Sequence, residues 1–339
     1  MFMSEQRSII PSIEDSGQKT YSANAAPIRQ KTPKIGPLIA GLFVIGLIIL
    51  GSVSYISWNW LKNLQIAIGP SSVPAPSITT LNVQRSATYA DLNFTILNAQ
   101  YATSFPDDTI QSGPAVVRIN LHVTNKTTTQ ISVIYYDVAR LLAPKLSPLA
   151  PTTVHLSANP KPGSSETGWI DFPVAKGTQL AKLTLQLGSV LLNETLVTIP
   201  FSGSFDPSRY TDKLSQQSLA ISYNFSGNTL VYHLQSVDIR YSYQGKQCQA
   251  RDQYYVFNFT VDNPNGVTVS PGFGFDYIRL IINGYNRPPV DNTLPYGFNP
   301  NTHGIGGRVV FIAPAGLTTL NFAFLLQVVV GQNTYQVTV

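Results

Sequence analysis

Hydrophobic residues follow two different patterns along this chain. Residues 35–58 form an uncharged apolar run, which at about 1.5 Å of rise per residue is long enough to cross a hydrocarbon core of roughly 30 Å with some tilt. Beyond this run, apolar and polar residues alternate in short segments separated by Asn, Pro and Gly, and no helical period occurs. The pattern predicts a single transmembrane helix over residues 35–58, followed by an all-β region.

The charges around the apolar run indicate its orientation. Arg29, Lys31 and Lys34 precede the run, whereas only Lys62 follows it closely. Because cytoplasmic flanks carry the excess of basic residues, we predict a single-pass protein of the cell membrane with a cytoplasmic N-terminus and extracellular C-terminal domains. The apolar run and the segment before it are both too long for a cleaved signal peptide.

Two segments of distinct composition flank the predicted helix. Residues 1–34 are rich in Ser, Gln, Pro and Thr and contain few aromatic residues, so they predict a disordered cytoplasmic tail. Residues 59–77 end in the Pro-rich stretch GPSSVPAPS. This composition favours an extended spacer between the membrane and the domains that follow.

The region after the spacer contains an internal repeat. Four blocks recur in the same order at a nearly constant offset. The matched blocks are LNFTILNAQY with YHLQSVDIRY, VRINLHVTN with VFNFTVDN, YYDVARLL with FDYIRLII, and GWIDFPV with GRVVFIA. In the first block both copies shift their apolar phase at the same place, between Phe94 and Leu97 and between Leu234 and Val237. Such a shift predicts a bulged strand in each copy.

The repeat and its short alternating segments predict two tandem immunoglobulin-like β-sandwiches. Their boundaries are predicted at 78–201 and 205–339, with the polar stretch SGSFDPS as a hinge. The predicted fold class is therefore all-β, with both sandwiches behind one N-terminal transmembrane helix.

The blocks YADLNFTILNAQYA, VVRINLHVTN, YYDVARLLAP and ETGWIDFPV, in that order, resemble the telokin-like immunoglobulin-type domains of secreted and membrane-anchored bacterial proteins. The likeness covers most of Thr88 to Leu187 and, more weakly, Leu230 to Gln327. The resemblance implies disulfide-free sandwiches outside the cell, in two tandem copies, and leaves their biochemical role unknown. The DNPNG turn at Asp262 to Gly266 is also similar to the NPN motif of membrane-anchored late-embryogenesis-type domains in plants.

Composition narrows the classes of function. Only 12% of residues are charged and the net charge of +5 is spread along the chain, which is not the basic patch typical of nucleic-acid binding. Cys248 is the only cysteine, so neither an intrachain disulfide nor a cysteine-based zinc site is expected. The histidines stand apart from one another, and no P-loop, HExxH or GxSxG pattern occurs. We therefore expect no metal, no cofactor and no enzymatic activity.

A charged pair recurs in both repeats. Asp137 with Arg140 corresponds to Asp276 with Arg279. A spacing of three places the two members of each pair on opposite faces of a strand. This spacing favours a local turn or strand-edge role over a paired ligand site.

Two polar features of the first repeat have plain explanations. Arg118, Asn120 and His122 alternate with apolar residues, so they predict the exposed face of a half-buried strand. Asp107 and Asp108 are adjacent carboxylates. They are explained equally by a cation site and by an exposed acidic turn.

The richest signal for recognition lies in the second repeat. Residues 285–300 read YNRPPVDNTLPYGFNP, which predicts a long irregular loop holding Tyr285, Arg287, Tyr296 and Phe298. Aromatic residues and arginine dominate recognition surfaces, and loops on a rigid scaffold carry them. The alternative is that these rings cap the end of a core.

These features predict a membrane-anchored extracytoplasmic binding or scaffolding protein. It would contact membrane lipid through the helix 35–58 and bind a protein, a peptide or an envelope glycan, but no nucleic acid. A surface sensor that relays a signal is the alternative, and a cell-envelope enzyme with a spatially assembled site is less favoured. The tail 1–34 contains no recognisable signalling motif, which weighs against the sensor.

Overall fold

The computed structural model of this chain describes residues 77–107, 113–325 and 332–339. The predicted tail 1–34, the predicted helix 35–58 and nearly all of the spacer lie outside these ranges. Within them, no helix is long and apolar enough to cross a membrane. The described residues belong to one compact unit, 74–339, and their regular secondary structure is almost entirely β, as the alternating pattern predicts.

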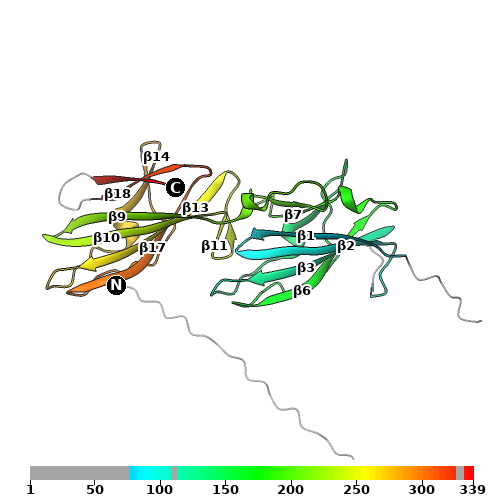
Figure 1. Cartoon of the computed structure of the whole chain (residues 1–339), viewed down its shortest axis with the longest axis horizontal. Coiled ribbons are helices and arrows are strands. Elements are labelled where there is room, and N and C mark those ends of the chain that lie inside the picture. Colours follow the sequence, from blue (N-terminus) through cyan, green and yellow to red (C-terminus); the bar gives the residue numbers. More distant parts are fainter. Residues whose placement is uncertain (1–76, 108–112, 326–331) are drawn as a thin grey trace, which may run out of the picture. The chain divides into compact units, whose positions relative to one another are not determined.

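The first half of this unit consists of two facing sheets (Figure 1). Its strands are β1 (Thr79–Tyr89), β2 (Leu92–Ala102), β3 (Ala115–Asn125), β4 (Ala139–Leu142), β5 (Thr153–His155), β6 (Ser165–Val174), β7 (Thr184–Leu187) and β8 (Val197–Pro200). One sheet has the order β1-β2-β3-β6-β5 and the other β4-β7-β8. The one-turn helix α2 (Tyr135–Val138) leads into β4, and the 3-10 turn η1 (Leu180–Lys182) precedes β7. Inward-facing residues of both sheets, such as Phe94 and Leu185, form one core.

The second half repeats this arrangement after the 3-10 turn η2 (Pro207–Tyr210). Its strands are β9 (Lys213–Phe225), β10 (Asn228–Arg240), β11 (Ser242–Tyr243), β12 (Lys246–Gln247), β13 (Asp252–Asn263), β14 (Ile278–Ile282), β15 (Tyr285–Arg287), β16 (Asp291–Asn292), β17 (Thr302–Pro314), β18 (Thr319–Leu325) and β19 (Gln332–Thr338). The helix α3 (Gly274–Tyr277) leads into β14. One sheet has the order β16-β17-β13-β10-β9 and the other β15-β14-β18-β19.

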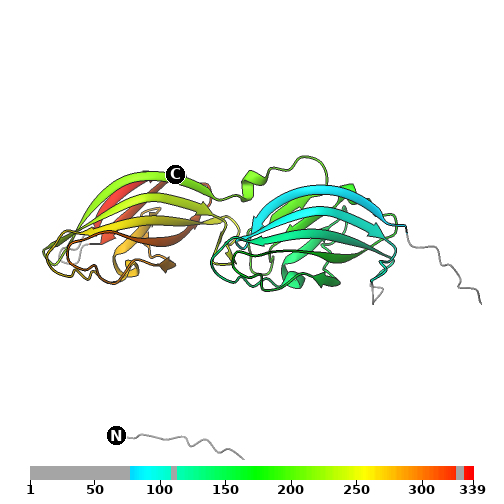
Figure 2. The ribbon, with the colours of Figure 1, turned by 60° about the horizontal axis from the view of Figure 1, so that its bottom comes forward.

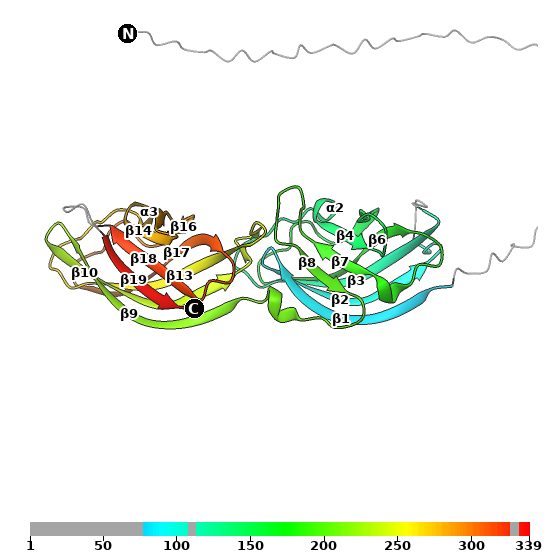
Figure 3. The ribbon, with the colours of Figure 1, turned by 90° about the horizontal axis from the view of Figure 1, so that it is seen from above.

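The two halves share one strand order. The sequence β1-β2-β3-β6-β5 corresponds to β9-β10-β13-β17-β16, and β4-β7-β8 corresponds to β14-β18-β19. Figure 3 shows the smaller sheet of each half lying over the larger one, and in Figure 2 the long strands of each half are strongly curved. The additions in the second half are β15 and the short hairpin β11–β12. This strand order agrees with the repeat in the sequence.

The predicted bulges occur in both halves. The pairing of β2 with β3 shifts register between Ile96 and Asn98, and the pairing of β10 with β13 shifts between Leu234 and Ser236. A bulge moves the following residues to the opposite face of the strand. It therefore keeps apolar residues directed into the core on both sides of the irregularity.

The corresponding strands β3 and β13 each end at an asparagine, and the two asparagines are aligned in the repeat. Asn125 is fully buried and its amide donates to Thr129 O (2.9 Å) and Pro160 O (3.0 Å). Asn263 is equally buried and donates to Val267 O (3.0 Å) and to Phe298 O (2.9 Å). Each side chain satisfies backbone carbonyls that the loops would otherwise bury without a partner. The DNPNG turn is therefore part of the scaffold.

The segment predicted as a hinge, residues 202–208, is fastened to the first half. Arg85 donates to Ser202 O (3.2 Å) and to Gly203 O, and its guanidinium carbon lies 5.7 Å from the centroid of the Phe205 ring. Tyr210, which lies beyond the predicted boundary, belongs to the core of the first half.

A hydrogen-bonded junction joins the two halves. Asp91, in the turn between β1 and β2, accepts from the Ser242 hydroxyl (2.8 Å) and from the Gly245 amide (2.8 Å) of the β11–β12 hairpin. A second set of bonds runs between backbone groups, from Thr195 N to Cys248 O (2.7 Å) and from Ala250 N to Asn193 O (2.6 Å). The two cores are separate, but the halves contact one another beyond their covalent connection.

Candidate functional site

The structure separates the predicted contact residues into two groups. Tyr285, Arg287 and Tyr296 are exposed, and Tyr296 retains 57% of its surface. Phe298 is only 1% exposed. Residues 285–300 are also more regular than the predicted loop, because they contain β15 and β16.

Phe298 is a core residue, and its assignment to a contact surface is wrong. Its ring lies 6.1 Å from that of Tyr232 between centroids, and its backbone pairs with Val269 in both directions (3.0 and 2.9 Å). Its carbonyl also accepts from Asn263. The Phe298 ring is turned inward because its backbone pairs with the loop after β13. The Pro- and Gly-rich sequence around Phe298 gives no sign of this long-range pairing.

Tyr296 is part of an exposed aromatic cluster that was not predicted. Its ring lies 5.2 Å from that of Phe273, at an interplanar angle of 67°. Phe273 precedes α3 and is 52% exposed, and Phe275 within α3 is exposed as well. The α3 cluster therefore consists of Phe273, Phe275 and Tyr296. Contacts of Tyr285 lie elsewhere, since it pairs with Ile282 at the far end of β14.

The first half exposes apolar residues at the same positions of its repeat. Ile134 precedes α2 and corresponds to Phe273, and Tyr136 corresponds to Phe275. Both are at least half exposed. The residue identities differ between the copies, but the apolar character and the exposure are shared. The aligned blocks YYDVARLL and FDYIRLII contain Tyr136 and Phe275, so the sequence did carry a signal for this shared feature. The alternating pattern alone assigns both blocks to a strand.

The recurring Asp and Arg residues stabilise the one-turn helices locally. Arg140 donates to the carbonyls of Tyr136 (2.8 Å) and Ala139 (2.7 Å). Arg279 makes the equivalent bonds in the second half. Asp276 accepts from the Phe273 amide at 2.8 Å and so fixes the start of α3. The predicted local role is confirmed for both arginines and for Asp276.

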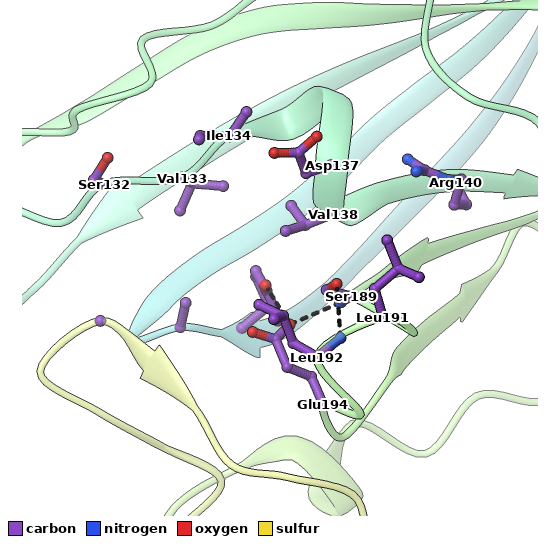
Figure 4. Close-up of a pocket in the computed structure, with 13 residues that line it drawn as sticks. Ser132, Val133, Ile134, Asp137, Val138, Arg140, Ser189, Leu191, Leu192 and Glu194 are labelled. Carbon is purple, nitrogen blue, oxygen red and sulfur yellow. Dashed lines mark hydrogen bonds between the residues drawn. The ribbon is translucent and has the colours of Figure 1, made fainter.

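A groove lies beside α2 in the first half. Its volume is about 440 Å³. It is lined by Tyr89, Ala90, Ser132, Val133, Ile134, Asp137, Val138, Arg140, Ser189, Leu191, Leu192, Glu194 and Gly245. Figure 4 shows Ile134, Asp137 and Val138 on one side and Leu191, Leu192 and Glu194 on the other. The lining is chiefly apolar, and its charged residues are Asp137, Arg140 and Glu194.

Glu194 anchors the loop between β7 and β8, which lines this groove. Its carboxylate accepts from the Tyr89 hydroxyl (2.9 Å) and from the Ser189 amide (2.7 Å). Burial, together with the Glu194 charge, raises the pKa of the Tyr89 phenol well above its usual value. Tyr89 therefore remains a donor throughout the physiological pH range, and the loop after β7 is held in place.

The acidic turn before residue 108 is part of an ion-pair cluster. Both oxygens of Asp107 accept from Arg118 Nη1 (2.9 and 2.8 Å), and Asp171 binds the same guanidinium through Nε and Nη2 (2.8 Å each). The guanidinium carbon lies over the rings of Phe105 (4.2 Å to the centroid) and Trp169 (4.8 Å). Arg118 is thus buried, contrary to the predicted exposed face of β3, because loop 103–107 covers it. Asp107 serves this ion pair, and Asp108 lies outside the described residues.

A cluster of titratable groups in the second half surrounds Asp262. His233 and His303 flank the carboxylate of Asp262 at 3.2 and 3.7 Å, and the Gly304 amide donates to the same group (2.7 Å). The hydrogen bond from the Gly304 amide lowers the pKa of Asp262, and the two imidazoles lower it further. Together these effects outweigh the opposing effect of burial. In the part of the chain that the structure describes, no group of three His, Cys, Asp or Glu residues is placed to hold a metal ion.

Comparisons with known proteins give little further information. No protein-family model matches the chain, and no curated protein matches it. Among solved structures, a functionally unknown protein from Listeria monocytogenes EGD-e is similar over 37% of this chain and 88% of that chain, at 14% identity and a TM-score of 0.28. A TM-score this low carries no weight for fold or function.

Proposed function

We propose that this protein is a membrane-anchored extracytoplasmic module that binds an apolar segment of a partner protein through the α3 cluster. The observation that carries the proposal is the exposed pair of apolar residues at the start of α2 and α3, which recurs in both halves although burial does not require it. Exposed apolar clusters of this kind mark interaction sites more often than scattered single residues do. The membrane anchor rests on the apolar run 35–58.

The geometry of the rings favours a peptide over a glycan. Phe273 and Tyr296 meet at 67°, so they form a notch and not the flat platform on which a sugar ring stacks. A notch between aromatic edges accepts an aliphatic or aromatic side chain. Of the partner classes considered for this protein, a protein or peptide therefore fits best.

The α3 cluster is also preorganised. Asp276 holds the Phe273 amide, and Arg279 donates to the carbonyl of Phe275 at 2.7 Å. Pro295 precedes Tyr296 and restricts the backbone there. Rings held in place before binding lose little entropy when a partner arrives, which raises affinity without additional contacts.

The fold assignment belongs to the same proposal. Two facing antiparallel sheets in each half, without a disulfide, are what an immunoglobulin-like sandwich would have. The resemblance to telokin-like immunoglobulin-type domains, in two tandem copies, supports an extracytoplasmic location. Scaffolding near the membrane is the role that such a pair of domains would serve.

Selection of random displayed peptides on the full chain in nanodiscs, beside an array of envelope glycans, tests this function. Wild-type protein is expected to enrich peptides with large apolar residues. Combined Phe273→Ala and Tyr296→Ala should weaken binding of an enriched peptide roughly 10- to 100-fold, since central aromatic contacts dominate interfaces. The variant should melt within a few degrees of wild type because both side chains are exposed.

Two further variants provide controls. Leu214→Ala removes an exposed apolar residue of β9, and Tyr285→Ala removes an exposed ring at the far end of β14. Neither should change peptide binding. Enrichment of glycans with no enriched peptide, or equal losses from Tyr285→Ala and the double variant, would contradict a peptide surface at α3.

A further inference from the structure

The groove beside α2 has a projecting apolar tip on its edge. Val190, Leu191 and Leu192 follow one another in the loop between β7 and β8, and all three are exposed. Leu191 retains 98% of its surface. Three consecutive exposed aliphatic side chains form a contiguous apolar patch, which is more informative than a single exposed leucine.

Hydrogen bonds hold this tip rigid at both ends. The Leu192 amide donates to Ser189 Oγ (3.3 Å), the Asn193 amide to Val190 O (3.1 Å) and the Glu194 amide to Ser189 O (3.0 Å). The Asn193 carbonyl accepts from Ala250 across the junction. These bonds fix the backbone that presents Leu191, so the exposed position of this residue is built into the loop.

The sequence repeats the apolar character of the tip. Aligning Leu183 with Leu320, as the fourth block of the repeat does, places Val328 and Val329 at the positions of Leu191 and Leu192. These valines lie outside the described residues, so the comparison is one of sequence. Aliphatic residues thus occupy both positions in each copy. Because both copies keep aliphatic residues at positions that are exposed in the first half, we infer that these residues serve an interaction.

We propose that the tip and the groove of the first half are the two parts of a self-complementary surface, through which this chain pairs with a second copy of itself. In a two-fold symmetric contact each surface meets its own copy, so a projection needs a hollow beside it on the same face. Here Leu191 of one copy enters the groove of the other, against Ile134 and Val138, and the reciprocal contact forms at the same time.

The charges at the groove satisfy the same symmetry. Arg140, Asp137 and Glu194 line it, so a two-fold axis can bring the arginine of one copy near a carboxylate of the other. A bilayer would meet only the projecting tip and would leave the groove empty. A groove lined by two carboxylates and one guanidinium also gives no attraction to anionic lipid. A second copy uses both features.

The contact is small, so pairing should be weak in dilute solution. The groove and tip involve far fewer residues than the roughly 20 to 30 a side of a standard interface. Confinement of chains in one membrane raises their effective concentration. The surface itself is independent of the proposed function, whereas the pairing of chains in a cell rests on the proposed membrane anchor.

Mixed cross-linking of the full chain in vesicles tests the contact. One population carries Leu191→Cys with one tag and the other carries Ile134→Cys with a second tag, and a short bifunctional maleimide is added. Cys248 does not interfere, because it is 1% exposed and burial, with the charge of Asp252, raises its pKa to about 12. We expect the mixed product to exceed both single-population products.

Leu214→Cys, an exposed position on β9, gives the background. A mixed product no greater than this background would overturn the proposal. Predominant Leu191-to-Leu191 product would place tip against tip and would also overturn it. An environment-sensitive dye on Leu191→Cys that reports an apolar surrounding on vesicles, without cross-linking, would assign the tip to the bilayer instead.

Sedimentation of the full chain in detergent gives a second measurement. Leu191→Ala removes the projecting side chain from both members of a pair, so it should weaken association roughly 10- to 100-fold. Leu214→Ala should leave association unchanged. Loss of peptide binding at the α3 cluster would not follow from Leu191→Ala, which separates this test from that of the proposed function.

Discussion

The two halves of this protein bury different kinds of residue pair at the same place in the larger sheet. On the outer face of the large sheet, Arg118 of β3 stands directly opposite Asp171 of β6 as an ion pair. At the corresponding positions of the second half, Val256 of β13 stands opposite Val310 of β17. All four side chains are buried. The same backbone pairing therefore accepts a charged pair or an apolar pair.

What covers each pair explains the difference. In the first half, the rings of Phe105 and Trp169 both pack on the Arg118 guanidinium. In the second half, Tyr243 and Cys248 of the β11–β12 region pack on the valines and form a small core of their own. The buried pair in each half therefore matches the segment that covers it.

The main cores differ in a parallel manner. Of the largest fully buried side chains, only Phe94 and Phe172 belong to the first half, and all the others are aromatic residues of the second. The second core includes two facing phenols, with Tyr232 Oη 2.8 Å from Tyr277 Oη. Volume that the first half fills with aliphatic residues is filled by rings in the second.

Alkaline pH should distinguish the halves most strongly. Burial raises the pKa of Tyr232, Tyr277 and Tyr223, and it raises the pKa of Tyr243 and Tyr254 to about 12. Because the unfolded chain ionises first, stability is complete below about pH 10 and falls by about 1.4 kcal/mol per pH unit for each fully buried phenol above it. In the first half burial raises the pKa of Tyr89 and Tyr135, so fewer phenols contribute to this loss there.

We therefore expect the second half to unfold at the lower pH. With Trp58→Phe and Trp60→Phe in the full chain, Trp169 is the remaining tryptophan and reports the first half. Near-ultraviolet circular dichroism of the tyrosines reports mainly the second. Coincident loss of both signals would show that the halves unfold together.

Exchanging the ion pair for the valine pair should test whether the two solutions are equivalent. Arg118→Val alone leaves Asp171 charged and buried, so it should cost about 3 to 5 kcal/mol in the free energy of unfolding. Arg118→Val with Asp171→Val should recover most of that loss, because matched apolar residues replace buried ion pairs at little cost. Urea denaturation measures both variants. A single substitution as mild as the double one would refute the requirement for matching.

Removing one phenol of the buried pair should have a smaller effect. Tyr232→Phe leaves the Tyr277 hydroxyl without its partner in the core, at a cost of about 1 to 3 kcal/mol. Tyr232→Phe with Tyr277→Phe should be nearly neutral relative to wild type, since no unpaired hydroxyl remains. Tyr296→Phe, on an exposed ring, is the control and should change little. Thermal melting followed by circular dichroism compares the three.

Weakening the junction should have the smallest effect on stability. Asp91 has a φ of 60°, which Asn tolerates as well. Asp91→Asn keeps one acceptor and loses the charge, so it should cost about 1 to 2 kcal/mol. The predicted boundaries 78–201 and 205–339 imply that each half melts on its own. Calorimetry should therefore show two transitions in both proteins. One transition in wild type that becomes two in this variant would show instead that the junction couples the halves.

The alternating positions predicted much of the fold in advance. Val117, Ile119, Leu121 and Val123 are all fully buried in β3, as their alternation predicts. The bulges in β2 and β10 occur where the apolar phase shifts. Both follow from local rules, because neighbouring side chains of a strand point to opposite faces and a register change must be matched by the sequence.

Some positions require glycine because a distant segment packs closely against them. In the sequence, these positions appear only as glycines that recur in both repeats. Gly168 and Gly307 are aligned in the fourth block. A Cβ at Gly168 would collide with His155 O, and one at Gly307 would lie 2.6 Å from a methyl carbon of Leu294. The alignment preserves the glycines, but the close approach of the neighbouring segment that requires them exists only in the folded chain.

Local patterns along the chain were enough to establish the β class, the repeat, the bulged strands and the local role of the recurring arginines, because each depends on residues close together in sequence. Long-range packing alone makes Phe298 a buried residue, encloses Arg118 under loop 103–107, and brings Phe273 to Tyr296 on the surface. Each of these depends on which distant loop covers a given side chain. A period-two pattern shows the face on which a side chain lies, but it contains no information about what packs against that face.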